Sequence, residues 1–385
     1  MKNAISRIGG GWWQTKKLGD VCDIKTGKKD VNEGNPTGRY PFFTCAREHT
    51  FSDSYSFDVE ALLVAGNGDV GHVNYYKGKF EAYQRTYVLS GFKNVLPNFL
   101  FIFLDGFLKE TVSKQKLGNT MPYIKMGMLT DFPVPVPSLP EQHRIVTILD
   151  EAFDDIASAK ANAEKNLQNA RALFESHLQA IFSRRGEGWV EKSLEELGTI
   201  TSSKRIFKNE YVKSGVPFYR TKEIKELANG REITTELFIS EARYKEIKKN
   251  FGVPKKGDIL LTAIGTIGEI WVVVGENDFY FKDGNVLWLK EFASINPRFL
   301  KYVLMSFVES LNKMAHGSAY SALPIQRLNA HRIFLPSPEE QEKIVAKLDS
   351  LSEETQHLES IYQQKLAALE ALKKSLLHHA FSGEL

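Results

Sequence analysis

Two stretches of the chain space their apolar residues alternately four and three positions apart. This spacing predicts a long helix with one narrow apolar stripe, as in a coiled coil. No proline or glycine interrupts either stretch after its first turn, and forty-odd residues at about 1.5 Å each predict a rod of about 65 Å. In residues 138–183 the stripe consists of Ile145, Leu149, Ala152, Ile156, Ala159, Ala163, Leu167, Ala170, Phe174 and Ile181. In residues 338–383 it includes Ile344, Leu348, Leu351, Leu358, Tyr362, Leu366, Leu369, Leu372, Leu376 and Ala380.

The entry to each stretch is a repeated passage. VPVPSLPEQHRIVTILD (134–150) aligns without a gap to IFLPSPEEQEKIVAKLD (333–349) at an offset of 199. Both passages predict capping boxes, Ser138 with Glu141 and Ser337 with Glu340. A further repeat, W-x-x-K-x-L, begins at Trp13 and again at Trp189, at an offset of 176. The larger later offset places about 21 extra residues in the second copy, between Tyr219 and Ile259.

The repeat divides the chain into two heads that alternate with two rods. The predicted domains are a first head (1–137), a helix with its linker (138–188), a second head (189–337) and a final helix (338–385). Each head mixes period-2 strand patterns with amphipathic helices at 97–117 and 296–316. Because heads and rods alternate, we expect the rods to pair antiparallel. The predicted fold is α+β, with two mixed α/β heads separated by an antiparallel coiled coil and related by a pseudo-twofold axis.

Charge differs between the heads and the rods. The heads carry 17 Lys and Arg against 13 Asp and Glu (1–137) and 22 against 17 (189–337). The rods carry 6 against 8 (138–188) and 5 against 9 (338–385). Mildly basic heads suit contact with phosphates, and acidic rods suit protein partners, although solvated rod faces would look the same. Two cysteines, no secretory leader and no apolar run of membrane length predict a cytoplasmic protein without a membrane partner.

The predicted loops hold many side chains of the types that contact DNA. Arg and Lys suit guanine and phosphate, and Asn suits adenine, but any one of them taken alone is more often an ordinary surface residue. The first head offers Lys25, Lys28, Lys29, Arg39, Arg47, His49, Asn67, Arg85, Lys114, Lys116 and Asn119. The second head offers Lys204, Arg205, Arg220, Lys222, Arg231, Lys282, Asn285, His316, Ser318, Tyr320 and Arg327.

Catalytic and cofactor motifs are missing from the sequence. GNGDVG (66–71) fits the dinucleotide pattern G-x-G-x-x-G, but a strand-like pattern follows it where that site needs a helix. We find no phosphate loop, no metal-type Cys or His spacing and no adenine-methyltransferase tetrapeptide. We therefore expect no catalytic residue, no metal and no cofactor.

Three paired features of the sequence belong together: the W-x-x-K-x-L motifs at Trp13 and Trp189, the P-x-x-[PE]-E-Q-x-x-I-V-x-x-L-D passages at 137–150 and 336–349, and the rod ends LQAIFS and LHHAFSGEL. With them the chain resembles the specificity subunit of type I restriction-modification systems. The resemblance covers essentially the whole chain. It implies that each head is a target recognition domain for one half of a split double-stranded DNA site. It implies that the rods set the spacer and bind two modification subunits, which carry the cofactor and methylate adenine, and that motor-nuclease restriction subunits complete the complex.

Two other interpretations compete with this one. A coiled-coil adaptor with two protein-binding heads would share the rods but not a salt-dependent affinity for DNA. A nucleotide-dependent enzyme would require a helix after residue 71. The recognised bases, the spacer length, the base-contacting residues and the presence of a restriction subunit lie beyond the sequence.

Overall fold

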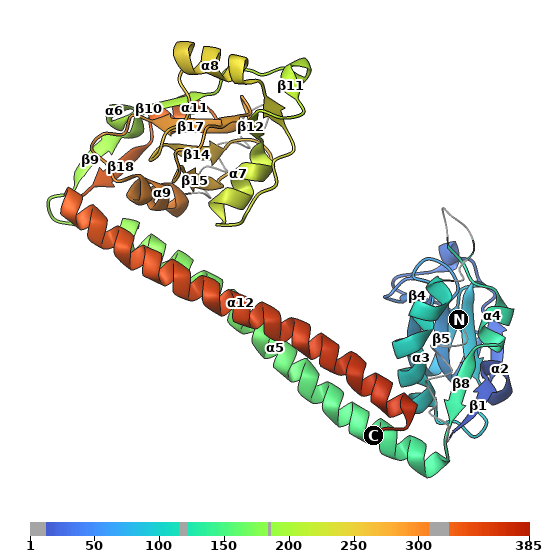
Figure 1. Ribbon diagram of the computed structural model, residues 1–385. Helices are drawn as coiled ribbons and strands as arrows, with labels where there is room; N and C mark the ends of the chain where they lie inside the picture. The colour runs from blue at the N-terminus through green and yellow to red at the C-terminus, as the bar shows by residue number, and fades with distance from the viewer. Residues whose placement is uncertain (1–12, 115–116, 118–121, 184–185, 308–322) are drawn as a thin grey trace. The chain divides into compact units, whose positions relative to one another are not determined.

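The computed structural model describes residues 13–114, 117, 122–183, 186–307 and 323–385 (Figure 1). The chain forms two compact units. The first unit takes Met1–Lys165 and Tyr362–Leu385, and the second takes Asn166–Ile361. Each unit therefore combines one head with a portion of both long helices.

The first head is built on one six-stranded sheet with the strand order β2-β7-β5-β6-β3-β4. Its neighbouring strands are antiparallel except β3 and β6, which are parallel. A separate two-stranded ribbon of β1 and β8 lies where the head meets the rod. Its elements are β1 (Gln14–Lys17), α2 (Leu18–Val21), β2 (Asp23–Thr26), η1 (Val31–Glu33), β3 (Tyr40–Phe43), β4 (Thr50–Ser52), β5 (Phe57–Ala65), β6 (Val73–Ala82), β7 (Thr86–Ser90), α3 (Pro97–Ser113), α4 (Met126–Thr130) and β8 (Pro133–Val136).

The second head repeats this order with its sheet divided in two. One sheet runs β10-β17-β14-β15 and the other runs β11-β13-β12-β16. Its elements are β9 (Val190–Ser193), α6 (Leu194–Leu197), β10 (Thr199–Ser202), η2 (Lys208–Glu210), β11 (Tyr211–Val212), β12 (Val216–Tyr219), α7 (Thr221–Ala228), β13 (Phe238–Ile239), α8 (Glu241–Asn250), β14 (Ile259–Thr262), β15 (Ile270–Val272), β16 (Tyr280–Phe281), β17 (Val286–Lys290), α9 (Pro297–Ser306), α11 (Ile325–Asn329) and β18 (Arg332–Leu335).

The two heads can be aligned strand by strand. Leu62 pairs with Tyr75 in the first head, and Ile259 pairs with Val272 in the second, so β5 and β6 correspond to β14 and β15. The single strand β6 pairs with both β5 and β3, whereas its counterpart is split into β15 and β16. That split is the reason why the second head has two sheets.

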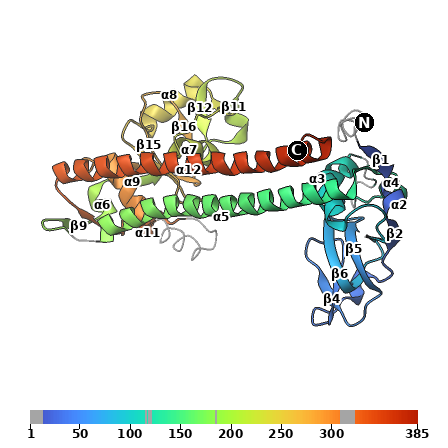
Figure 2. The same cartoon turned by 90° about the horizontal axis from the view of Figure 1, so that it is seen from below.

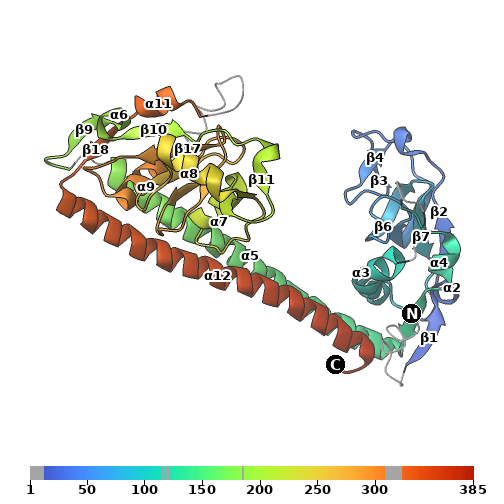
Figure 3. The same cartoon turned by 45° about the horizontal axis from the view of Figure 1, so that its top comes forward.

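The extra residues of the second head form structure of their own. The elements α7, β13 and α8 occupy 221–250, inside the interval where the sequence offset changes. Figure 3 shows α7 and α8 on the second head. Ile224 of α7 and Ile247 of α8 are fully buried, so the insertion adds core as well as surface.

The two predicted long helices are present as α5 (Leu139–Ser183) and α12 (Pro338–Ser382), each 45 residues long. In the first unit Lys160 of α5 pairs with Glu370 of α12, with 2.6 Å between amine and carboxylate. In the second unit Arg171 pairs with Glu359 at 2.9 Å. Moving forward along α5 thus moves backward along α12, which is the predicted antiparallel pairing; both helices are visible in Figure 2.

The predicted apolar stripe is correct along α5 but only partly along α12. Leu149, Ala163 and Ala170 are buried. On α12, however, Leu358 and Leu372 are 37% and 47% exposed, while Thr355 is buried. The Thr355 hydroxyl donates to backbone carbonyls of its own helix, at 2.8 Å from Leu351, which allows this polar residue at a buried position.

One glutamine of each repeated passage joins a head to its rod. Gln142 is fully buried; its amide donates to the carbonyls of Pro137 and Asn94, and its oxygen accepts from the Leu96 amide at 2.7 Å. Gln341 is 1% exposed and makes the corresponding bonds to Pro336 and to the Asn296 amide. The repeated E-Q therefore fixes the segment that precedes α3 or α9 against the start of the long helix.

Each head core also includes the end of a long helix. In the first unit Phe381 of α12 is fully buried, and its ring lies 5.0–5.7 Å from those of Phe99, Phe103 and Phe107. In the second unit Phe182 of α5 lies 5.6 Å from Phe299. The repeated rod-end phenylalanine is therefore a packing anchor for the head.

The expected capping boxes form only in part. The Ser337 hydroxyl accepts from the Glu340 amide at 3.3 Å, but the Glu340 carboxylate accepts from the Trp189 indole at 3.1 Å instead of returning to the cap. At the other helix start the Glu141 carboxylate pairs with Arg144. Tertiary partners within reach thus replace the local bond that the pattern predicts.

The glycine-rich turn at 66–71 opens no helix. Gly68 and Gly71 have positive φ values of 62° and 82°, and strand β6 begins at Val73. This removes the nucleotide-enzyme interpretation, which required a helix here.

Among the described residues, none of the helices combines the length and the apolar character that a membrane span requires. Cys22 and Cys45 are both buried free thiols.

Candidate nucleic-acid interface

In the first head, two of the candidate loops lie against each other at one end of the sheet. The loop after β2 carries Lys28 and Lys29, and the turn between β6 and β7 carries Gln84 and Arg85. The Gln84 amide donates to the Lys29 carbonyl at 3.0 Å, so the two segments are directly bonded. Gly27 makes this approach possible, because a Cβ there would overlap the Ala82 carbonyl.

The second head brings together the corresponding segments. Lys204 and Arg205 follow β10 at the same offset, 176, that relates the strands β2 and β10. The turn before β17 carries Lys282 and Asn285. The two segments are bonded through the Ser203 hydroxyl to the Phe281 carbonyl at 2.7 Å. We call these two places the basic turns: Lys28, Lys29, Gln84 and Arg85 in the first head, and Lys204, Arg205, Lys282 and Asn285 in the second.

A third segment joins each basic turn. In the first head the Gly66 amide donates to the Arg85 carbonyl at 3.0 Å, and the Ile124 amide donates to the Gly66 carbonyl at 2.9 Å. In the second head Ala263 donates to Asn285 at 2.8 Å, and Leu323 donates to Ala263 at 3.0 Å. The same three-segment backbone framework is thus present in both heads, although different side chains project from it.

The cations of the basic turns differ in how far they are neutralised. Arg205 pairs with Asp283 at 2.7 Å, which raises the pKa of the guanidinium, and Lys282 lies 3.4 Å from the same carboxylate. Lys29 donates to the Ser52 and Ser54 hydroxyls and lies 3.8 Å from the buried Glu81. Lys28 and Arg85 are exposed and make no ion pair with any described residue.

A cleft of about 570 Å³ lies beside Arg85. Tyr123 and Lys125, which the sequence analysis did not select, line it together with Gln84. Tyr123 pairs through its backbone with Asn67 and Leu117. No local pattern in the sequence marks these residues: they precede α4 in the chain, and folding brings them beside the turn, where the Ile124 amide donates to the Gly66 carbonyl.

The other candidates of the first head lie apart from its basic turn or are engaged in structure. Asn67 is only 7% exposed, at the bridge to Tyr123. Arg47 and Lys109 both bind Asp69, and the bond from Lys109 is the main cause that lowers the pKa of this carboxyl. Lys114 pairs with Glu110 within α3.

Lys25, Arg39 and His49 complete the described candidates of the first head. Lys25 is exposed on β2. The Arg39 guanidinium lies 5.8 Å from the Tyr40 ring, and the His49 ring lies 5.2 Å from that of Phe43. Arg39 and His49 therefore each lie beside an aromatic ring, on the side of the sheet formed by β3 and β4.

In the second head, the cations of the insertion are neutralised locally. Arg220 pairs with Glu223 and Glu236, both at 2.7 Å, which raises the pKa of the guanidinium. Lys222 shares Glu236 at 3.0 Å. Arg231 pairs with Glu226 at 3.1 Å. A cation that already has a carboxylate gains less from a phosphate, so these residues rank below Lys28 and Arg85 as DNA contacts.

The remaining candidates are placed as follows. Lys204 is exposed, with its amine 5.0 Å from the Phe251 ring. Arg327 is exposed on α11 and has an interaction partner. Five candidates lie outside the described residues: Lys116, Asn119, His316, Ser318 and Tyr320.

The described part of the chain gives no sign of a metal centre, because it contains no group of three His, Cys, Asp or Glu side chains suited to hold an ion. Two similar heads, each with a basic loop bonded to a turn, and two paired long helices define the class of the protein: a duplicated α+β protein with an antiparallel helical pair.

The chain belongs to the family of type I restriction-modification DNA specificity domains, whose model matches residues 11–167 and again residues 186–370. It is 28% identical over 412 residues to the EcoDI specificity subunit of Escherichia coli, with 97% of this chain and 88% of that protein covered. It is also 23% identical to the MjaIX specificity subunit of Methanocaldococcus jannaschii, with 86% and 78% covered. This membership favours DNA recognition over the adaptor interpretation.

Solved structures show the same fold. A chain from a study of complex assembly and conformational transition of the type I R-M system matches with a TM-score of 0.77 at 19% identity, covering 97% of this chain and 98% of that one. The HsdS subunit from Thermoanaerobacter tengcongensis matches with a TM-score of 0.57 at 18% identity, with 97% and 98% covered.

Proposed function

We propose that the chain is the non-catalytic specificity subunit of a type I restriction-modification complex, and that each head recognises one half of a split DNA target through its basic turn. The observation that supports this most directly is the repetition of the basic turn. The two heads differ in the details of their folds. Both nevertheless carry a pair of cations directly after the corresponding strand, β2 or β10, beside the same three-segment backbone framework. A purely structural role would not require Lys28 and Arg85 to be exposed and without an ion-pair partner among the residues that the structure describes.

The difference between the two basic turns supports two different half-sites. The first presents Arg85 where the second presents Asn285. Arg suits the O6 and N7 of guanine, and Asn suits the N6 and N7 of adenine. The surrounding cations contact phosphates and fix the register of each head on the duplex.

The long helices have two roles in this proposal. They set the distance between the half-sites, and they bind two modification subunits, which methylate adenine. Motor-nuclease subunits join the same complex when it restricts DNA. Because a rigid link makes the second half-site binding intramolecular, neither head requires high affinity alone.

DNA binding by the assembled complex tests the role of the basic turns. Lys28→Ala should weaken binding and lower the salt slope by about one, as expected for one lost phosphate contact, whereas Arg85→Ala should weaken binding of the target by about 1–3 kcal/mol, as expected for one lost base contact. Lys93→Ala is the matched control, because Lys93 is exposed and pairs with Asp23 at the opposite end of β2. Equal effects at Lys28, Arg85 and Lys93 would contradict the proposal.

Mapping of N6-methyladenine tests the division of labour. Arg85→Ala should relax recognition in one half of the target only, and Asn285→Ala in the other. Adding four residues to each long helix at the same level lengthens the rod by about 6 Å and should lengthen the tolerated spacer by about two base pairs. A spacer that stays unchanged would rule out the ruler role while leaving the head assignments open to their own test.

The non-catalytic role has a separate test. The purified chain with DNA and S-adenosylmethionine should transfer no methyl group until the modification subunit is added. Methyl transfer by the chain alone would overturn this part of the proposal.

A further inference from the structure

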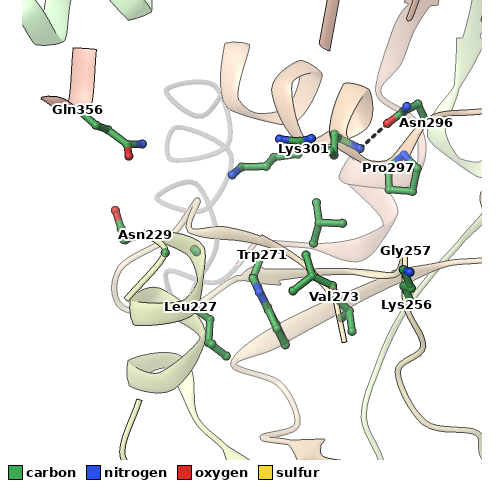
Figure 4. Close-up of a pocket in the computed structure, with 15 residues that line it drawn as sticks. Leu227, Asn229, Lys256, Gly257, Trp271, Val273, Asn296, Pro297, Lys301 and Gln356 are labelled. Carbon is green, nitrogen blue, oxygen red and sulfur yellow. Dashed lines mark hydrogen bonds between the residues drawn. The ribbon is translucent and has the colours of Figure 1, made fainter. Parts of the chain in front are cut away.

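The second unit contains a cleft of about 700 Å³ that the DNA-recognition role leaves without a function. It lies between the end of the inserted helix α7, strand β15, helix α9 and helix α12 (Figure 4). Its wall is mainly apolar, with Leu227, Trp271 and Val273 among the residues that line it. The volume falls within the range of ligand sites.

One side of this apolar space carries positive charge without negative charge. The described lining residues include three cations and no carboxylate. Arg298 is engaged by Asp349 at 2.7 Å. Lys301 makes no ion pair with any described residue, and burial is the main cause that lowers the pKa of its amine. The nearest carboxylate, Asp349, opposes this shift but is already bonded by Arg298 and by the Tyr302 hydroxyl. In Figure 4 Lys301 extends from α9 toward the space between Asn229 and Gln356.

In the first head, aromatic side chains stand at the two positions that correspond to Val272 and Lys301. Tyr75 corresponds to Val272 by strand register, and Phe101 corresponds to Lys301, because α3 and α9 both begin with an aligned proline. The Tyr75 and Phe101 rings lie 6.2 Å apart, against each other. The second head replaces two aromatic side chains by a valine and a cation, and the inserted α7 borders the resulting space.

We propose that this cleft binds an apolar group that carries a carboxylate. The aliphatic and indole wall accepts the apolar part, and the Lys301 ammonium, with the amide of Gln356 opposite, accepts the anion. Bringing a carboxylate to a half-buried cation restores the counterion that the cleft lacks, and charge-assisted bonds in such surroundings are stronger than neutral ones. This inference is independent of the DNA-reading proposal.

Calorimetry and ligand-observed NMR on the full chain test the chemistry. The probes are 3-phenylpropionate and its neutral amide, and the peptide acetyl-Phe-Glu-amide. We expect the acid to bind and the amide to bind at least about tenfold more weakly, the size of one charge-assisted bond. The peptide separates two sources of the same group: tighter binding than the free acid points to a protein segment, and weaker binding to a small molecule.

Three variants complete the design. Lys301→Met keeps the side-chain bulk and should remove the preference for acid over amide. The double substitution Val272→Tyr with Lys301→Phe copies the first head and should abolish binding of both probes. Lys245→Met, at an exposed position of α8, is the control and should bind like the unaltered chain.

Far-ultraviolet circular dichroism spectra that match the spectrum of the unaltered chain establish that the variants are folded. Equal affinity for acid and amide, unchanged preference in Lys301→Met, or no binding of any probe at millimolar concentration would overturn the proposal.

Discussion

Replacing Gln142 by methionine tests the link between the first head and the start of its long helix. Methionine has a similar size but cannot hydrogen-bond in the same way. The change leaves the Leu96 amide and the carbonyls of Asn94 and Pro137 without the partner they have in the fully buried Gln142 side chain. Asn94 is a non-glycine residue with a positive φ of 55°, so its conformation depends on such support.

The magnitude follows from the groups that lose partners. A buried N–H without an acceptor costs about 1–3 kcal/mol, and a carbonyl with a second lone pair costs less. We therefore expect Gln142→Met to destabilise the head–rod junction by about 3 kcal/mol, which is roughly a 150-fold change in the local opening equilibrium.

Hydrogen exchange measured by mass spectrometry reports this opening directly. In Gln142→Met the segment 94–100 should exchange roughly 100-fold faster or more, whereas 296–300 should stay protected. Gln341→Met should give the reverse pattern, because Gln341 holds the Asn296 amide in the second head. Each variant thus serves as the control for the other.

Gln142→Glu distinguishes loss of the donor from loss of the acceptor. A carboxylate still accepts from Leu96 but cannot donate to the two carbonyls at neutral pH. Because a buried carboxylate opposite two carbonyl oxygens is unfavourable, we expect exchange at least as fast as in Gln142→Met at neutral pH, and slower exchange relative to Gln142→Met when the pH falls and the carboxyl gains a proton. Unchanged protection at 94–100 in both Gln142 variants would refute the reasoning.

Three further predictions concern the first unit. Gly27→Ala should strain the basic turn by roughly 1–3 kcal/mol, because its Cβ overlaps the Ala82 carbonyl, and should weaken DNA binding in a filter assay. Phe381→Ala should cost about 3–5 kcal/mol, measured as faster proteolysis of the first unit, because it empties a fully buried aromatic site. Asp69→Asn should lower the free energy of unfolding by at most about 1 kcal/mol, since the ions are partly exposed. The folded-state pKa of Asp69 is depressed, chiefly by the bond from Lys109, so its contribution is present above the unfolded-state pKa and is lost as the pH falls through the folded-state pKa. Denaturant titrations of Asp69→Asn and the unaltered chain should therefore differ at pH 7 and converge in acid.

The amino-acid sequence by itself determined the features that depend on local periodicity and on repetition. The four-three spacing of apolar residues gave two helices of equal length, because a helix presents one face regardless of its partner. The changing offset located the insertion that became α7, β13 and α8. The alternating pattern after residue 71 gave strand β6 and argued against a nucleotide site.

Tertiary structure alone decided which side chains are available and what they contact. Lys28 and Arg205 each belong to a basic pair that follows the corresponding strand, yet among the described residues Arg205 has a carboxylate beside it, on a turn 78 residues away, and Lys28 has none. The repeated glutamine was visible in the sequence, but its three buried bonds were not. The cleft at Lys301 depends on residues of α7, β15, α9 and α12 meeting in space. Burial and ion pairing are properties of neighbours brought together by folding, so no local pattern of the chain encodes them.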